Sequence, residues 1–376
     1  MVDSLQLLTG DAQTFVEKVW ASRPLVHRVE SAALAAMLDL DDVDQLLTST
    51  ALRTPALRLA KDGEVLASSR FTRSARLGGV ALTGLVDVRK VFDLFDDGAT
   101  VVLQGLHRYW PPLTGLIRDL ELTLGHPSQA NAYLTPPSSQ GFALHTDNHD
   151  VFVLQIFGRK LWEIHDGDER QEVMLEPGTS MYLPAGTPHA ARTQDQASLH
   201  VTVGINQLTW RHLLDTLTNR ALGDDELDAA LPAGYIDDPA ILTNELRPRL
   251  NKLATAIAAT DPTEVAERQV QDFLTSRPAH VRGGLGDRLA ANEITDETDL
   301  ARRPGSVCLP VADGERLRVL LGDRELRIPI RLAAAIEHVR VQARLRPADL
   351  APWLDEQSRL VLARRLVREG LLQVAG

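Results

Sequence analysis

Residues 142–165 read FALHTDNHDVFVLQIFGRKLWEIH, and residues 178–189 read GTSMYLPAGTPH. Both stretches alternate apolar and polar residues in short runs that glycine and proline interrupt. The same pattern extends from Asn131 to Asn206, and it predicts strands at Asn131–Thr135, Phe142–Phe157, Lys160–His165, Glu172–Leu183 and Ser198–Ile205. Short alternating runs separated by turn residues are typical of an antiparallel β-sandwich or barrel. The centre of the chain therefore predicts an all-β domain.

A candidate metal site begins with the triplet His145-Thr146-Asp147. Residues two apart on a strand point to the same face, so we expect the imidazole and the carboxylate to converge. The second motif, G-x5-P-x-G-x2-H, ends at His189, just past a turn that proline and glycine impose. Two histidines and one carboxylate on one face leave coordination positions open, as non-haem iron oxygenases require. We therefore predict that His145, Asp147 and His189 bind a metal.

Two alternatives accompany this metal site. The three polar groups could be hydrogen-bonded in a sandwich without metal, but pointing them unpaired into an apolar barrel would cost several kcal/mol. His149 shares the predicted strand face with His145 and Asp147, so it could be a further ligand or line the mouth of the site. The strand before His189 is expected to carry Met181 and Leu183 inward.

Lys160 is the third candidate functional residue. It follows Phe157-Gly158-Arg159, which we expect to form a hairpin onto the strand beside the one that carries the triplet. A buried ammonium needs an anion, and in a site of this kind the natural anion is the distal carboxylate of 2-oxoglutarate. If Lys160 faces inward, Arg159 should face outward. The alternative is an ordinary lysine on the surface.

The flanking regions read mainly as helix. The 3.6-residue spacing of apolar positions predicts helices at Ala12–Trp20, His212–Ala221, Pro239–Ala259 and Pro262–Ser276. Arg277-Pro278 and Gly283–Gly286 are expected to form a linker. Beyond it we expect a hairpin, three helices and a closing strand at Leu317–Leu321 with Glu325–Ile328, Pro329–Ala343, Pro347–Leu354, Gln357–Glu369 and Leu371–Val374. Helices beside a small β-ribbon suggest a winged-helix-like module.

Composition limits the classes of function. The net charge of the 376 residues is -11, whereas residues 301–376 hold 14 Arg, no Lys and 9 acidic residues, about +5, which leaves about -16 for the first 300. A net negative charge over the first 300 residues repels phosphates, which argues against an enzyme that acts on nucleic acid. The same charge suits a basic protein or peptide partner, or it serves solubility alone. Cys308 is the only cysteine, so no internal disulfide can form. Without an export signal or an apolar membrane span, we expect a cytoplasmic protein.

These residues resemble the ribosomal oxygenases, which are JmjC-type, cupin-like hydroxylases. The likeness is carried by Asn131–Asp147, Val151–Gln155 and Gly158–Trp162, and Trp20 with Arg23-Pro24-Leu25 resembles the opening segment of that family. It is dense over residues 131–206 and looser elsewhere. The resemblance implies an α+β chain with three parts: a catalytic double-stranded β-helix (a JmjC jelly roll) at 1–210, a helical dimerisation region at 211–282 and a winged-helix-like domain at 283–376.

The resemblance also implies roles for individual residues. His145, Asp147 and His189 would bind Fe(II), and Lys160 would pair with the carboxylate of the co-substrate 2-oxoglutarate. The residues that would line the co-substrate pocket are Tyr133, Asn131 and Thr202. The chain would then be a 2-oxoglutarate-dependent dioxygenase that hydroxylates an arginine or histidine of a ribosomal protein, working as a homodimer. The chain departs from the family pattern at Thr146-Asp147-Asn148-His149, which bears on substrate choice and leaves the triad unchanged.

Other functions remain open at this stage. The chain could hydroxylate a free amino acid or a peptide natural product. It could be another metallo-cupin that needs no co-substrate, although Lys160 and Tyr133 argue against this. It could also be a non-enzymatic regulator whose arginine-rich end binds nucleic acid, although those arginines alternate with acids at spacings that allow helical ion pairs.

Overall fold

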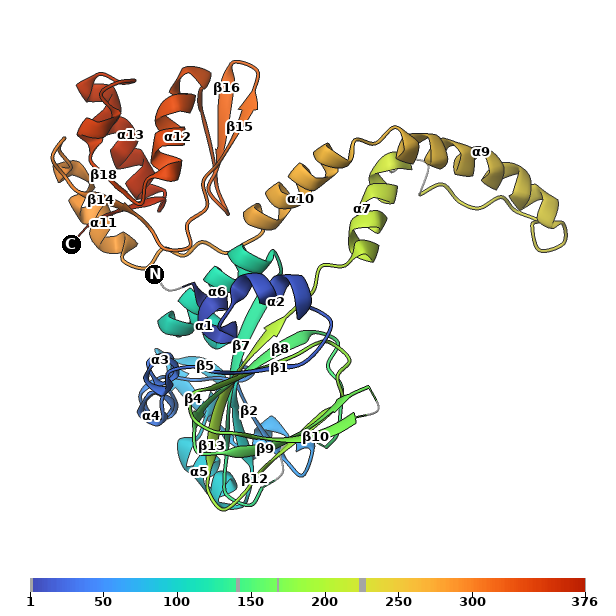
Figure 1. Cartoon of the computed structure of the whole chain (residues 1–376), viewed down its shortest axis with the longest axis vertical. Helices are drawn as coiled ribbons and strands as arrows, with labels where there is room; N and C mark the ends of the chain where they lie inside the picture. The colour runs from blue at the N-terminus through green and yellow to red at the C-terminus, as the bar shows by residue number, and fades with distance from the viewer. Residues whose placement is uncertain (1–2, 140–142, 168, 223–227, 376) are drawn as a thin grey trace. The chain divides into compact units, whose positions relative to one another are not determined.

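The computed structural model describes residues 3–139, 143–167, 169–222 and 228–375, and the chain divides into two compact units, Met1–Gln207 and Leu208–Gly376 (Figure 1). The expected catalytic domain, residues 1–210, has nearly the same extent as the first unit. The expected division of the remainder at residues 282 and 283 stays a prediction.

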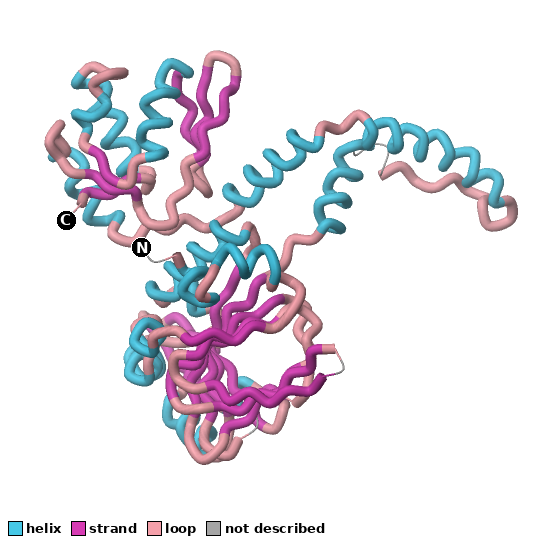
Figure 2. Tube along the Cα trace, viewed as in Figure 1, coloured by secondary structure: helices cyan, strands magenta, loops and turns pink. Residues whose placement is uncertain are grey.

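Strands form the centre of the first unit, and helices lie at its margin (Figure 2). Its helices are α1 Ser4–Thr9, α2 Ala12–Lys18, α3 Ser31–Ala35, α4 Leu40–Ser49, α5 Val88–Asp96 and α6 Pro111–Leu124, with short 3-10 turns η1 Ser68–Arg70 and η2 Leu106–Arg108. Its strands are β1 Leu25–Arg28, β2 Leu57–Lys61, β3 Glu64–Val65, β4 Thr72–Leu77, β5 Val80–Val86, β6 Thr100–Leu103, β7 Ser128–Thr135, β8 Asp150–Phe157, β9 Lys160–Asp166, β10 Glu169–Leu175, β11 Thr179–Leu183, β12 His189–Thr193 and β13 Ser198–Ile205.

Two antiparallel sheets form the body of the first unit. The large sheet has the order β1-β11-β8-β13-β7-β6-β2-β3, and the small one has the order β10-β9-β12. A separate hairpin pairs β4 with β5. Val153 of β8 and Met181 of β11 pack with Trp162 of β9 in one buried cluster, so this face of the large sheet meets the small sheet. This confirms that Met181 and Leu183 point inward.

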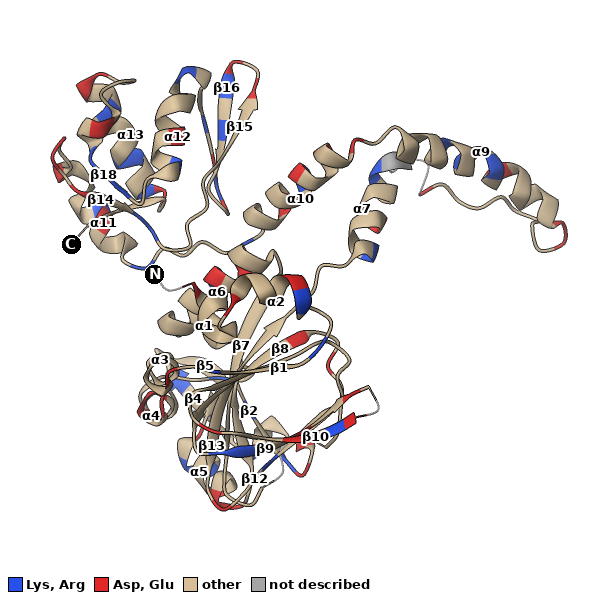
Figure 3. Ribbon diagram, viewed as in Figure 1, with Lys and Arg blue, Asp and Glu red and all other residues tan. Residues whose placement is uncertain are grey.

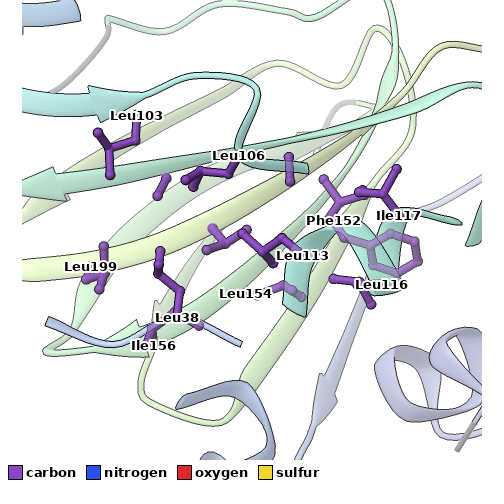
Figure 4. Close-up of a cluster of buried hydrophobic side chains, with 14 of the residues drawn as sticks. Leu38, Leu103, Leu106, Leu113, Leu116, Ile117, Phe152, Leu154, Ile156 and Leu199 are labelled. Atoms are coloured by element: carbon purple, nitrogen blue, oxygen red, sulfur yellow. The ribbon is translucent and has the colours of Figure 1, made fainter. Parts of the chain in front are cut away.

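The opposite face of the large sheet packs against helices. Because side chains alternate along a strand, Val151 and Val153 face the small sheet, while Phe152 and Leu154 enter the main hydrophobic core. Figure 4 shows Phe152 beside Leu116 and Ile117 of α6. Helices therefore cover one face of the large sheet, and the face toward the small sheet can carry the side chains of a site.

Three details of the predicted strands were wrong. Residues 143–149 form no strand, and β8 begins at Asp150; Gln140 to Phe142 lie outside the described residues. The predicted strand Glu172–Leu183 is two strands, β10 and β11, because Pro177 and Gly178, with φ of 86°, turn the chain between them.

The expected hairpin at Gly158 is also absent among the described strands. β8 pairs with β11 and β13, whereas β9 pairs with β10 and β12, so the chain crosses from one sheet to the other at this point. Gly158 has φ of 61°, and a Cβ there would lie 1.9 Å from the carbonyl oxygen of Ala197. A residue without a side chain is required at this crossing.

The second unit contains helices and three small groups of strands. Its helices are α7 Trp210–Leu222, α9 Pro239–Ala258, α10 Pro262–Thr275, α11 Gly284–Ala290, α12 Ala333–Val341 and α13 Glu356–Arg368, with 3-10 turns η3 Ala291–Glu293, η4 Ile330–Leu332 and η5 Pro347–Leu350. Its strands are β14 Leu300–Arg302, β15 Leu309–Asp313, β16 Arg316–Leu320, β17 Glu325–Pro329, β18 Arg344–Leu345 and β19 Leu372–Val374. They form the sheets β18-β14-β19 and β15-β16-β17.

The second unit matches most of the elements expected there. The predicted hairpin is β16 with β17, and the closing strand is β19. The linker expected at Gly283–Gly286 was wrong in part, because α11 begins at Gly284. A buried cluster that includes Ile336 and Leu366 gives the end of this unit its own hydrophobic core.

Candidate metal centre

The three predicted ligands converge at the rim between the two sheets. His189 is the first residue of β12, and the backbones of His145 and His189 exchange two hydrogen bonds of 3.1 and 2.9 Å. Gly186 donates its backbone N–H to the carbonyl of Asp147 at 2.8 Å. His145 and Asp147 therefore lie in a loop held against the turn before His189, and the expectation that a continuous strand carries them was wrong.

The donor atoms of these residues are close enough for one ion. One ligand atom from each of His145, Asp147 and His189 lies within 4.8 Å of the others, and His189 Nε2 is 3.6 Å from Asp147 Oδ2. Nitrogen and carboxylate ligands bind at about 2.0–2.2 Å, so neighbouring ligands around one ion lie about 3 Å apart and only a small adjustment is needed. Burial also lowers the pKa of His189, which favours the neutral imidazole that a metal binds.

The backbone orients both imidazole rings. His145 Nδ1 lies 2.8 Å from the carbonyl oxygen of Ala143, and His189 Nδ1 lies 2.9 Å from that of Thr187. A carbonyl accepts only, so each Nδ1 carries the proton and donates it. Each Nε2 then presents a lone pair to the shared point, as second-shell hydrogen bonds do in metal sites. These residues fit a divalent metal.

His149 lies near the triad, but the group of described residues that can share an ion does not include it. Its Nδ1 lies 3.2 Å from Asn148 Oδ1, and its ring lies over Gly204, where a Cβ would come within 2.8 Å of His149 Nε2. His149 lines the cavity beside the triad. The structure thus favours the second of the two expectations for this residue.

A cavity of about 710 Å³ opens at the triad. All seven residues singled out in the sequence line it: His145, Asp147, His189, Lys160, Tyr133, Asn131 and Thr202. Strand register explains the grouping on the large sheet, because Tyr133 pairs with His200 and Asn131 pairs with Thr202 across β7 and β13. Directly paired residues point to the same face, so these four side chains project from one face of the sheet.

Lys160 lies deep in this cavity with 3% of its surface exposed. Its Nζ donates to Thr135 Oγ1 at 3.1 Å, which links the small sheet to the large one. Among the described residues no carboxylate pairs with this ammonium, and burial lowers its pKa from 10.5 to about 7. Arg159 points outward to Asp195 at 3.0 Å. The inward orientation of Lys160 and the outward one of Arg159 are confirmed.

Further groups in the cavity were not predicted as site residues. Trp162 Nε1 and His200 Nδ1 are buried without a hydrogen-bond partner among the described residues. The His200 ring stacks on Tyr133 with centroids 5.0 Å apart, and burial, followed by the charge of Lys160, lowers its pKa well below 6.5. Strand alternation could have identified two further residues of the cavity region. Thr135 lies two residues after Tyr133, and Trp162 lies two residues after Lys160, so each shares a strand face with a predicted site residue. Unsatisfied polar groups beside a buried ammonium fit an anionic, hydrogen-bonding ligand.

Comparisons with known proteins agree with this geometry. A family model described as a JmjC domain matches residues 116–173 and 164–213. The bifunctional lysine-specific demethylase and histidyl-hydroxylase NO66 of Branchiostoma floridae is 38% identical over 154 residues, 39% of this chain and 25% of that protein. Ribosomal oxygenase 2 of Rattus norvegicus is 27% identical over 274 residues, 64% of this chain and 57% of that protein. The chain thus spans about a quarter to somewhat over half of these relatives.

A solved structure shares the overall fold. Escherichia coli ribosomal oxygenase YcfD, solved in complex with cobalt and 2-oxoglutarate, aligns with 98% of this chain and 99% of that one, at a TM-score of 0.54 and 20% sequence identity. Residues 116–213, nearly all of them in the first unit, thus match a JmjC domain, and the chain shares the fold of a solved ribosomal oxygenase. The resemblance to the ribosomal oxygenases, expected from the sequence, is confirmed.

Proposed function

We propose that this chain is an Fe(II)- and 2-oxoglutarate-dependent dioxygenase that hydroxylates a side chain of a ribosomal protein. The observation that carries the proposal is one cavity that holds both a three-residue metal site and a buried ammonium without a carboxylate partner among the described residues. Ribosomal oxygenases among the relatives and neighbours support the class of substrate.

Within this proposal, His145, Asp147 and His189 hold the iron, which supplies the oxygen activation that no side chain can supply. Lys160 binds the distal carboxylate of 2-oxoglutarate, and Thr135 fixes the position of its amine. Tyr133, Asn131 and Thr202 shape the wall beside it. Asn131 Oδ1 accepts from the N–H of Gly105 at 3.0 Å, which leaves its amide NH2 to donate into the cavity.

The charges of the cavity favour histidine over arginine as the hydroxylated residue. Arg58 and Arg108 line the cavity, and Asp147 is the only carboxylate among the described residues that do so. Since Asp147 binds the metal in this proposal, a guanidinium of the substrate would meet the positive charge of Arg108 and find no other carboxylate among the described residues that line the cavity. A neutral imidazole avoids that repulsion.

The test is incubation with large-subunit ribosomal proteins, Fe(II), 2-oxoglutarate and oxygen. We expect succinate release, together with the mass of one added oxygen on a histidine-containing peptide, and neither with Asp147→Ala. Succinate released without any modified ribosomal protein would point instead to a free amino acid or peptide natural product. An added oxygen on arginine would refute the preference for histidine.

We further propose that α7, α9 and α10 form a homodimer interface. α9 has no buried residue in the single chain, and its apolar Leu246, Leu250 and Ile257, at spacings of four and seven residues, are 46%, 53% and 44% exposed. An exposed apolar helix face of this kind is typical of an interface. Sedimentation of the full chain should give a dimer, and Leu250→Glu should give a monomer; a wild-type monomer at micromolar concentration would contradict the proposal.

The winged-helix-like assignment of residues 283–376 remains a proposal, and nucleic-acid binding there has little support. Its arginines and acids lie interleaved (Figure 3), and several form ion pairs, such as Arg346 with Asp299 at 2.8 Å and Arg324 with Glu369 at 3.0 Å. Paired arginines release few counterions on contact with phosphates. Binding to RNA should therefore be weak, and a steep salt dependence would contradict this expectation. Among the described residues, no helix combines the length and hydrophobicity needed to span a bilayer.

A further inference from the structure

Asp150 is a buried carboxylate just beyond the ligand loop. It is the first residue of β8, three residues after Asp147, and its side chain is completely buried. It accepts three hydrogen bonds: from Tyr182 Oη at 2.6 Å, from Gln207 Nε2 at 2.9 Å and from the backbone N–H of Ala185 at 2.8 Å. A buried carboxylate is costly unless donors surround it, and here neutral donors fill that role.

The bond from Ala185 joins the two segments that carry the metal ligands. Ala185 lies in the turn Pro184-Ala185-Gly186 that leads to His189, and Asp150 ends the loop that begins at His145. Three contacts follow one another along the loop and hold it to the turn. They are the backbone pair of His145 with His189, the hydrogen bond from Gly186 to the carbonyl of Asp147, and the hydrogen bond from Ala185 to the Asp150 carboxylate.

Asp150 pairs with Ile205 of β13 on one side, but pairing of β8 with β11 on the other side begins only at Val151, which pairs with Leu183. Between His145 and Val151 the loop has no continuous ladder to hold it against the turn. The side chain of Asp150 takes the place of a backbone partner at the position where the ladder is missing. If the Asp150 carboxylate is removed, only the contacts at His145 and Asp147 remain to fix the distance between Asp147 and His189.

We propose that Asp150 is a positioning residue that sets the separation of the two ligand-bearing segments and thereby the metal affinity of the site. Asp150 belongs neither to the three candidate ligands nor to the described residues that line the cavity, and it acts through Ala185 and the start of β8. The inference rests on the proposed metal site. Outer-shell partners of this kind typically change metal affinity by about 10- to 100-fold.

The test is a titration of the metal-free full chain with Co(II), followed by the quenching of tryptophan fluorescence. Trp162 reports on the site because its ring centroid lies 5.8 Å from that of His189. Asp150→Ala should weaken Co(II) binding by about tenfold or more. Asp150→Asn should lie between it and the wild type, because its amide oxygen can still accept from Ala185. Gln207→Leu is the matched control, since it removes one donor to the same carboxylate and leaves the bond to Ala185.

Hydrogen exchange gives a second measurement that does not depend on metal. The amides of Ala185 and Gly186 should exchange faster in Asp150→Ala, while those of the distant strand β6 should keep their wild-type rates. Wild-type Co(II) affinity in a folded Asp150→Ala protein would overturn the proposal, as would equal weakening by Gln207→Leu. A wild-type chain that binds no Co(II) would overturn the metal site itself, so the two failures are distinguishable.

Discussion

Binding of 2-oxoglutarate should weaken as the pH rises above neutrality, because Lys160 must carry its proton to hold the distal carboxylate. In the ligand-free protein, burial lowers the pKa of this ammonium from 10.5 to about 7. A bound carboxylate favours the charged form and raises the pKa again. Above pH 7 the co-substrate must therefore bind together with a proton.

The size of the effect follows from the fraction of Lys160 that is protonated. With a pKa of about 7, that fraction falls about 20-fold between pH 7.5 and 9.0, and the affinity should fall by the same factor. The stability of the ligand-free protein changes in the opposite direction. Since the pKa of folded Lys160 lies below its unfolded value, the unfolded chain binds more protons between about pH 7 and 10.5, and the free energy of unfolding rises with pH in that window.

The assay is calorimetric titration of 2-oxoglutarate into the metal-loaded protein without oxygen, in two buffers of different ionisation enthalpy. We expect uptake of close to one proton at pH 8.5. Lys160→Met should bind at least about 100-fold more weakly at pH 7, with no proton uptake, because a buried charged partner is lost. Arg159→Gln, which changes the exposed neighbour, should keep the wild-type profile. Affinity that stays constant with pH, or wild-type affinity in Lys160→Met, would refute the reasoning.

Three further substitutions test separate parts of the account. Thr135→Val removes the acceptor of Lys160 Nζ and should weaken 2-oxoglutarate binding by about tenfold or less, as measured by the same calorimetry. Gly158→Ala places a Cβ against the carbonyl of Ala197 at positive φ and should lower the free energy of unfolding by at least about 2 kcal/mol in a urea titration; unchanged stability would contradict the sheet crossing. Gly204→Ala pushes on the His149 ring, so it should reduce substrate-stimulated succinate release more than substrate-free release; equal reduction of both would count against a substrate-facing His149.

Local sequence was sufficient for the parts of the site that depend on short-range alternation. The alternation in the strand before His189 predicted that Met181 and Leu183 point inward. The proline and glycine before His189 predicted the turn, and the neighbours Arg159 and Lys160 predicted opposite directions. In each case the period of two along a strand decides the outcome.

Sequence was insufficient where pairing between distant segments decides the structure. The triplet at His145 reads as strand, yet its geometry comes from the bridge to His189, 44 residues later. Gly158 reads as a hairpin turn, but the partner of β9 is β12, which no local pattern identifies. Asp150 lies inside the predicted strand Phe142–Phe157, where nothing in the local pattern singles it out. Its role depends on Ala185, which only the folded chain brings near.

The most direct test of the central claim is an anaerobic absorption measurement on the protein with Fe(II) and 2-oxoglutarate. A 2-keto acid that chelates Fe(II) through its keto and carboxylate oxygens gives a visible charge-transfer band, and dilute 2-oxoglutarate and Fe(II) without protein serve as the blank. We predict this band for the wild type, its loss in Asp147→Ala, and a requirement for much more 2-oxoglutarate in Lys160→Met. A wild-type protein that takes up Fe(II) and shows no band, or an Asp147→Ala protein that keeps it, would contradict the assignment of the site.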